Sequence, residues 1–127
     1  MFRLNIRNPE VVIDLPNHGI FVFDNLSAMG KTYLLNVFNT VVANEAVVGY
    51  TYGDYKKHSI DKDFCKSRQV ILFDRYDRYR NVYDDLINEL SRDRIILVDC
   101  KNVAKLVNFD YEYCFIELGR NKIEVYG

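Results

Sequence analysis

Three short runs of consecutive apolar residues constrain the fold of this 127-residue chain more than any other feature. They are Ile20–Phe23, Val70–Phe73 and Ile95–Val98. A strand with one face in water alternates apolar and polar residues, so uninterrupted apolar runs of this length indicate strands that are buried on both faces. Burial on both faces requires helices on each side of the sheet, which is the arrangement of a parallel α/β domain.

Amphipathic segments lie between these runs. Apolar residues at helical spacing predict a helix over Lys31–Asn44 and another over Asn81–Arg92. The remaining patterns predict further strands at Phe2–Arg7, Val11–Leu15 and Ala46–Tyr52. They also predict a long polar loop with at most a helical turn over Gly53–Ser67 and a short helix over Asn102–Val107. The chain is expected to close with a hairpin of Tyr111–Leu118 and Lys122–Tyr126 around Gly119–Asn121.

The predicted fold class is therefore α/β. We expect one domain over residues 1–127, because a chain of this length has no room for a second core. Its centre is a mainly parallel sheet flanked by helices. The two N-terminal strands and the C-terminal hairpin are expected as antiparallel additions to that sheet.

Composition and charge exclude several classes of protein. A hydrophobic content of 49% with 28% charged residues is typical of a globular domain rather than a disordered chain. The net charge of −1 argues against nucleic acid or an anionic membrane as partner. The sequence contains no membrane-length apolar run and no signal peptide, and its three cysteines form no CxxC pair. We expect a cytosolic protein with reduced thiols.

The segment after the first apolar run fits a phosphate-binding pattern. Asn25-Leu26-Ser27-Ala28-Met29-Gly30-Lys31-Thr32 matches G-x-x-x-x-G-K-[ST] at every defined position except the first. In such a loop the backbone N–H groups and the following helix N-terminus surround a phosphate. Asparagine tolerates positive φ better than most residues, so Asn25 is expected to hold the first turn.

Individual roles follow from the motif. The Lys31 ammonium is expected to contact the β- and γ-phosphates, and the Thr32 hydroxyl to bind Mg²⁺. The predicted nucleotide contacts extend from Asn25 through Tyr33. Three nearby tyrosines, Tyr50, Tyr52 and Tyr55, either stack on the base or pack half-buried at strand ends, and we favour packing.

A carboxylate after a second buried strand completes the predicted site. Asp74 follows Val70–Phe73 directly, which is the form of a Walker B segment, and is expected to hold Mg²⁺ together with Thr32. The predicted catalytic set is Lys31, Asp74 and Asp77. Asp99 follows the third buried strand, where it either lies near the site or caps the next helix.

On these motifs the chain resembles a P-loop NTPase, and within that superfamily a minimal ABC/SMC-type ATP-binding domain. The likeness in layout covers most of the chain, including the closing hairpin. The chain departs from that type in having no LSGGQ-like signature and Arg75 rather than glutamate after Asp74. A second resemblance is to thymidylate kinases, whose Asp-Arg-Tyr element is similar to Asp74-Arg75-Tyr76.

The resemblance implies a small protein that binds ATP or GTP with Mg²⁺ and hydrolyses it weakly or only with a partner. A protein partner or a second copy of the chain is expected to complete the active site, as arginine fingers do. Two alternatives remain open: a small nucleotide kinase-like phosphotransferase, and an interaction module that kept the fold without the nucleotide. No base-specificity motif separates ATP from GTP.

Overall fold

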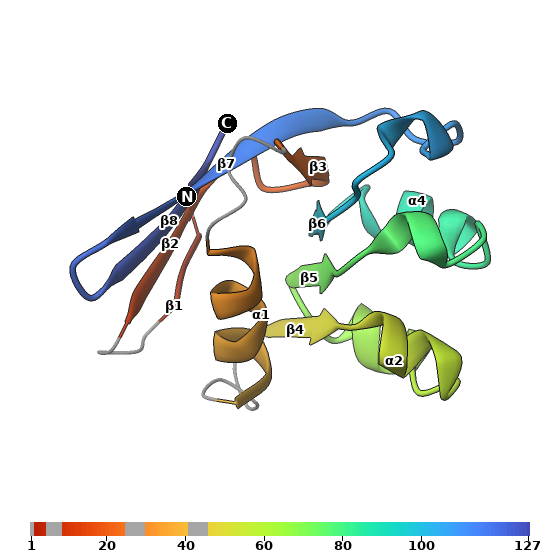
Figure 1. Ribbon diagram of the computed structural model, residues 1–127, viewed down its shortest axis with the longest axis horizontal. Helices are drawn as coiled ribbons and strands as arrows, with labels where there is room; N and C mark the ends of the chain where they lie inside the picture. The colour runs from red at the N-terminus through yellow and green to blue at the C-terminus, as the bar shows by residue number, and fades with distance from the viewer. Residues whose placement is uncertain (1, 5–8, 25–29, 41–45) are drawn as a thin grey trace.

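The structure is a computed structural model that describes residues 2–4, 9–24, 30–40 and 46–127 (Figure 1). Over these residues the strands form one eight-stranded sheet in the order β1-β2-β8-β7-β3-β6-β5-β4. The strands are β1 (Phe2–Leu4), β2 (Glu10–Asp14), β3 (Gly19–Phe23), β4 (Val47–Tyr50), β5 (Val70–Phe73), β6 (Ile95–Val98), β7 (Glu112–Gly119) and β8 (Lys122–Tyr126). The helices are α1 (Lys31–Thr40), α2 (Tyr52–Lys56), α3 (Lys62–Lys66) and α4 (Asp84–Leu90), with 3₁₀ turns η2 (Tyr76–Arg78) and η3 (Val103–Lys105).

The parallel core is confirmed. Strands β7, β3, β6, β5 and β4 pair side by side in parallel. All four residues of β5 and all four of β6 are buried, as their uninterrupted apolar sequences predicted. The α/β fold class is therefore correct.

The outer part of the sheet is mixed. The antiparallel pairs β1–β2 and β7–β8 are confirmed. The pair β2–β8, however, is parallel, with Val11 opposite Ile123 and Ile13 opposite Val125. This register places the buried residues of both strands in the same core cluster. An alternating pattern shows which face of a strand is buried but not the direction of its neighbour, so the sequence did not indicate this pairing.

Helices cover the two faces of the parallel sheet separately. Helix α1 packs in the core formed by one face of the parallel strands together with β2, β7 and β8, and it lies between these two parts of the sheet in Figure 1. The elements that follow β4, β5 and β6 pack on the opposite face. Among the residues placed by the structure, no helix is long and apolar enough to cross a membrane.

The stretch Gly53–Ser67 contains more helix than expected. Helix α2 begins after Thr51, which forms a reciprocal capping box with Asp54, and α3 begins after Asp61, whose carboxylate accepts two backbone N–H groups. These caps stabilise helices too short to show an apolar period. Elsewhere the predicted helices were too long: α4 starts at Asp84, and Asn102–Val107 contains only the 3₁₀ turn η3.

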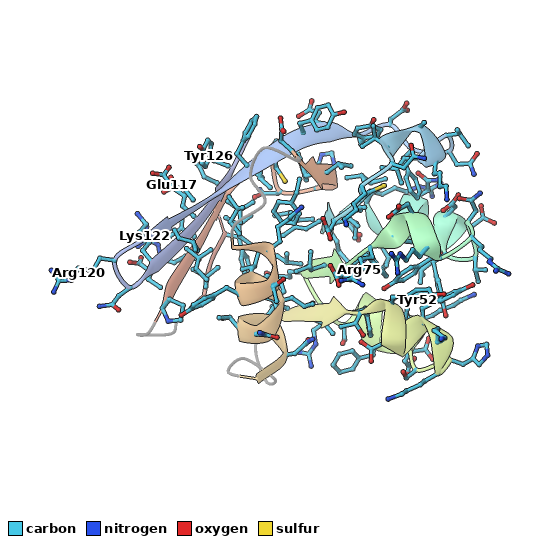
Figure 2. All side chains as sticks on the ribbon, in the orientation of Figure 1. Tyr52, Arg75, Glu117, Arg120, Lys122 and Tyr126 are labelled. Carbon is cyan, nitrogen blue, oxygen red and sulfur yellow. The ribbon has the colours of Figure 1, made fainter. Side chains whose placement is uncertain are left out.

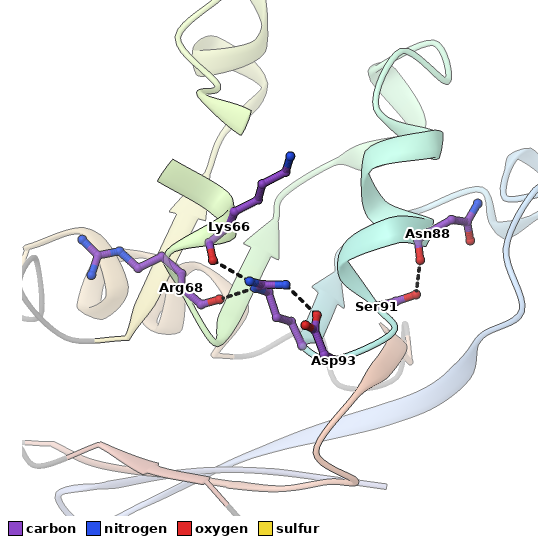
Figure 3. A network of polar contacts seen from close by, with 6 residues as sticks. Lys66, Arg68, Asn88, Ser91 and Asp93 are labelled. Atoms are coloured by element: carbon purple, nitrogen blue, oxygen red, sulfur yellow. Dashed lines mark hydrogen bonds and ion pairs between the residues drawn. The ribbon is translucent and has the colours of Figure 1, made fainter. Parts of the chain in front are cut away.

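The amino end of the parallel sheet is held by one arginine, Arg94, at the start of β6. Its Nε donates to the carbonyl of Arg68 at 3.0 Å and its Nη2 to the carbonyl of Lys66 at 2.5 Å (Figure 3). Its Nη1 also pairs with Asp93 at 2.5 Å. Arg94 therefore ties the end of α3 and the approach to β5 to the start of β6.

Helix α1 bonds to one outward N–H of β4, the strand at the edge of the sheet. The carbonyls of Ala46 and Tyr50 accept hydrogen bonds from the β5 side, so Gly49 directs its N–H outward. The Asn39 side chain of α1 accepts a hydrogen bond from that N–H at 3.1 Å. A Cβ at position 49 would lie 2.5 Å from Leu35 Cδ1, so the absent side chain allows α1 to approach the strand closely.

Candidate functional site

The candidate site lies where three parallel strands end side by side. Val98 at the end of β6 is in register with Val22 of β3 and with Phe73 of β5. The residues that follow these ends, Asp99 after β6 and Asp74 after β5, are consequently neighbours. Strand β6 lies between β3 and β5, so Asp99 is between the strand that leads to the predicted phosphate loop and the strand that carries Asp74.

The chain leaves β3 and β6 toward opposite faces of the sheet. From β3 it continues to α1 on one face, whereas from β6 it continues to η3 and Leu106, which pack on the other. Adjacent strands whose connections diverge in this way leave a crevice at their carboxyl ends, where ligands of open α/β sheets bind. The position between β3 and β6 is therefore the topological switch point of the sheet, where α/β proteins usually bind their ligands.

A lysine–aspartate ion pair joins the two sides of this switch point. Lys31, the first residue of α1, places its Nζ 2.7 Å from Oδ1 of Asp99. The two side chains are only 16% and 14% exposed. A charged pair this shielded from water interacts more strongly than a surface ion pair, and each partner would be costly to leave alone.

The carboxyl groups of Asp74 and Asp99 lie close enough to change each other's pKa. Burial, followed by the hydrogen bond and charge of Asp99, raises the pKa of Asp74 to about 6, although the charges of Arg75 and Lys31 oppose this rise. Burial also acts to raise the pKa of Asp99, but the hydrogen bonds to Asp74 and Lys31 and the lysine charge outweigh it and lower that pKa. The pair therefore keeps one proton well above the pH at which an exposed aspartate loses it.

We predict that Asp74 titrates near pH 6 in the ligand-free protein, measured by ¹³C NMR of its carboxyl carbon. Between pH 3.8 and about 6 the folded state keeps a proton that the unfolded chain has lost. The contribution of Asp74 to stability is thus greatest at the acid end of this window and is lost as the pH rises through about 6. Asp99, whose pKa is lowered, contributes with the opposite sign.

The variant Asp99→Asn tests the origin of that shift. It removes the neighbouring charge but leaves Asp74 in its buried position, so the pKa of Asp74 should fall only part of the way to 3.8. A titration unchanged by Asp99→Asn would contradict the proposed sharing of a proton between the two carboxyl groups.

Gly30 precedes Lys31 and joins the loop to α1. Its φ is +101°, and its carbonyl accepts the N–H of Leu34 at 2.8 Å in the first turn of the helix. A Cβ here would lie 3.1 Å from Leu118 Cδ2 and 3.3 Å from Ile116 Cδ1 of β7. The backbone conformation therefore favours glycine, and a Cβ would in addition press on the side chains of β7.

We predict that Gly30→Ala lowers the free energy of unfolding by about 1–3 kcal/mol, the usual cost of a strained backbone conformation. Urea denaturation would measure it. The double variant Gly30→Ala/Leu118→Ala removes the contact at 3.1 Å and should recover only the steric part of the loss. Full recovery would show that positive φ at position 30 is not a source of strain.

The structure places the other predicted site residues as follows. Thr32 and Tyr33 are exposed on the first turn of α1, Tyr33 at 49%. The loop residues Asn25, Leu26, Ser27, Ala28 and Met29 lie outside the described residues. Asp77 lies in η2 close to Cys100, where burial and then the Asp77 charge raise the pKa of the thiol to about 11. The structure thus groups Lys31, Asp74 and Asp99, and Asp77 has a different neighbour.

The sequence left two roles open for Asp99 and did not predict the conformation of Arg75. The side chain that caps η3 is Asn102, which accepts the Ala104 N–H, so the helix-cap alternative for Asp99 does not describe this turn. Arg75 is exposed in the left-handed conformation at φ 52°. Figure 2 shows Arg75 and Tyr52 at the same end of the sheet, after β5 and β4. Non-glycine residues in this conformation are uncommon and often mark functional turns.

A buried hydrogen-bond network supports the turn after Asp74. The Tyr76 N–H donates to the Asp99 carbonyl at 2.8 Å, and its hydroxyl donates to Asp84 Oδ1 at 2.5 Å. Asn108 Nδ2 donates to Asp84 Oδ2 at 2.7 Å. Asp84 is 5% exposed at the first turn of α4. Sequence reasoning missed this network because Asp84 is an ordinary acidic residue at a helix start, and no local pattern marks it as buried.

The tyrosines near the site pack against one another. Tyr55 stacks between Tyr52 and Tyr79, with ring centroids 5.8 and 4.8 Å apart, and Tyr50 stacks on Phe73. Tyr50 and Tyr79 are buried. This arrangement agrees with the packing interpretation of these tyrosines.

Within the described part of the chain, no group of three or more His, Cys, Asp or Glu side chains is placed to hold a metal ion. Neither a protein-family model nor a curated protein matches this sequence.

Proposed function

We propose that this protein binds a nucleoside triphosphate with Mg²⁺ at the carboxyl ends of β3, β5 and β6. The observation that carries the proposal is the position of Lys31. This shielded ammonium lies at the first residue of α1, over the topological switch point and beside two carboxyl groups. A phosphate bound there would meet the ammonium and the N-terminal end of a ten-residue helix, both of which favour an anion.

The side chains present suit a magnesium ion bound together with phosphate. Mg²⁺ is usually held by one or two carboxylates while water and phosphate oxygens fill its other positions, so a three-carboxylate cage is not required. Asp74, with the Thr32 hydroxyl, would hold the ion. Burial and then the adjacent Asp99 raise the pKa of Asp74, and a bound cation would relieve the repulsion between the two carboxylates.

Weak or partner-dependent hydrolysis follows as part of the proposal. Arg75 occupies the position directly after Asp74, and the structure places Asp77 beside Cys100. Arginine cannot act as the base after Asp74, and the contact of Asp77 is with Cys100, so we expect fast turnover to need a base from a second protein. The exposed Arg75 in its left-handed turn instead favours phosphate handling, which keeps a phosphotransferase as the alternative.

The deciding experiment is thermal unfolding with millimolar ATP, GTP or inorganic tripolyphosphate, each with Mg²⁺ and with EDTA. Binding at 100 times Kd stabilises the folded state by about 2.7 kcal/mol, which raises the melting temperature by several degrees. No shift with any of these ligands would leave the interaction module as the better description. Phosphate release, compared with transfer to a nucleoside monophosphate, then separates hydrolase from phosphotransferase.

A further inference from the structure

Lys31 already has an anionic partner in the ligand-free protein. Its Nζ lies 2.7 Å from Asp99 Oδ1, which is the distance expected for a charge-assisted hydrogen bond. A carboxylate oxygen and a phosphate oxygen are similar acceptors for an ammonium group, since both are anionic and accept at similar distances. If the proposed function is correct, the carboxylate of Asp99 is bonded to the same ammonium, that of Lys31, which the phosphates would contact.

The backbone around Asp99 is held in place. Its N–H donates to the Phe73 carbonyl at 2.8 Å, and its own carbonyl accepts the Tyr76 N–H at 2.8 Å. The strand end is thus bonded to β5 and to the turn after it. Since these two bonds use the backbone alone, they remain in place if the carboxylate changes its partner. The carboxylate itself interacts with Lys31, with Asp74 and with the backbone N–H of Arg75.

Charge makes the same residue unfavourable for an incoming triphosphate. The polyanion would approach Asp74 and Asp99 at the carboxyl ends of β5 and β6, and neighbouring like charges repel strongly where water is partly excluded. A divalent cation that entered with the phosphates would cancel this repulsion.

We propose that Asp99 is an internal competitor that holds Lys31 until a magnesium-bound triphosphate displaces it. This inference rests on the proposed function and adds a regulatory element to the same site. Asp99 thereby makes phosphate binding dependent on magnesium. Free triphosphate binds poorly because it must both take Lys31 from the carboxylate and remain near its uncompensated charge.

The expected effect is a gain in affinity when the competitor is removed. The apparent Kd equals the intrinsic Kd divided by the fraction of molecules competent to bind, so pairing that leaves about one molecule in ten competent weakens binding about tenfold. The isosteric change Asp99→Asn should therefore tighten binding by about this factor. The gain should be larger with EDTA than with Mg²⁺, because only the metal-free ligand meets the full charge of Asp99.

Calorimetric titration with ATP and with tripolyphosphate, each with Mg²⁺ and with EDTA, tests this for the wild type, Asp99→Asn and Asp99→Ser. The control is Asp85→Asn, which removes an exposed carboxylate from the first turn of α4. Tighter binding by the position-99 variants, with a reduced magnesium requirement, supports the proposal. Equal or weaker binding by these variants, with a binding-competent wild type, overturns it and leaves the proposed function standing. Failure of every protein to bind overturns the proposed function itself.

A measurement on the wild type covers the case in which the variants fold poorly. The ¹³C carboxyl signal of Asp99 should shift when magnesium tripolyphosphate is added, because the carboxylate loses its ammonium partner. The ¹⁵N signal of the Lys31 ammonium should move in the same titration. Binding that leaves both signals unchanged would overturn the competitor role.

Discussion

Replacement of Lys31 by alanine is expected to weaken binding of ATP with Mg²⁺ about 100-fold, which corresponds to about 2.7 kcal/mol. The size of the effect reflects a charged hydrogen-bond donor that is held at the first residue of α1 and shielded from water. The variant also removes an ammonium charge that stabilises the Asp74 and Asp99 carboxylates, which adds to the repulsion that the phosphates meet. Calorimetric titration would measure the loss.

The matched control is Lys62→Ala. Lys62 is likewise the first residue of a helix, α3, but it is exposed. The Lys62→Ala variant should bind ATP with the affinity of the wild type. Circular dichroism and urea denaturation would establish that Lys31→Ala remains folded. Unchanged affinity in folded Lys31→Ala would exclude the phosphate-binding role of this lysine.

The second large effect is expected at Asp84. Its two carboxylate oxygens accept separate hydrogen bonds from Tyr76 and Asn108 in a nearly closed environment. Asparagine has a similar shape but only one acceptor oxygen, so one of these donors must face an amide N–H₂ group. Asp84→Asn should therefore lower the free energy of unfolding by about 1–3 kcal/mol, measured by urea denaturation.

Asp85→Asn provides the comparison for that experiment. It makes the same chemical change one residue later in the same helical turn, on an exposed side chain, and should change stability by less than about 0.5 kcal/mol. Adding Tyr76→Phe to Asp84→Asn completes a double-mutant cycle. Strict additivity of the two substitutions would show that the hydroxyl–carboxylate bond does not stabilise the fold.

Asp84 also affects the site through Tyr76. The same tyrosine bonds the Asp99 carbonyl through its N–H, so the network positions the turn that follows Asp74 relative to Asp99. Loosening it in Asp84→Asn should change the titration of Asp74 although Asp84 lies in a different element.

The buried strands were predictable because each is an uninterrupted apolar run, and burial on both faces leaves few alternatives. Because Asp74 and Asp99 directly follow two of those strands, they were expected at the same, carboxyl-terminal end of the sheet. The contact between Lys31 and Asp99 was not predictable. It depends on β6 lying between β3 and β5, and strand order is set by long-range packing rather than by any local pattern.

Short helices with side-chain caps were the second place where the structure differs from the sequence prediction. Thr51 and Asp61 begin helices of five residues each, where side-chain caps contribute more than an apolar stripe. The buried position of Asp84 likewise depends on Tyr76 and Asn108, which are eight and 24 residues away in the chain. Such partners are known only once the elements have been placed.

The hydrogen bond between Asn39 and Gly49 has a consequence for assembly. An exposed terminal strand invites pairing with another chain, which can lead to extended sheets and aggregation. Here the amide oxygen of Asn39 accepts a hydrogen bond from the outward N–H of Gly49, which an added strand would need. Helix α1, which carries Asn39, also lies close against β4. Growth of the sheet across this border is therefore disfavoured, and self-association of the protein should use another surface.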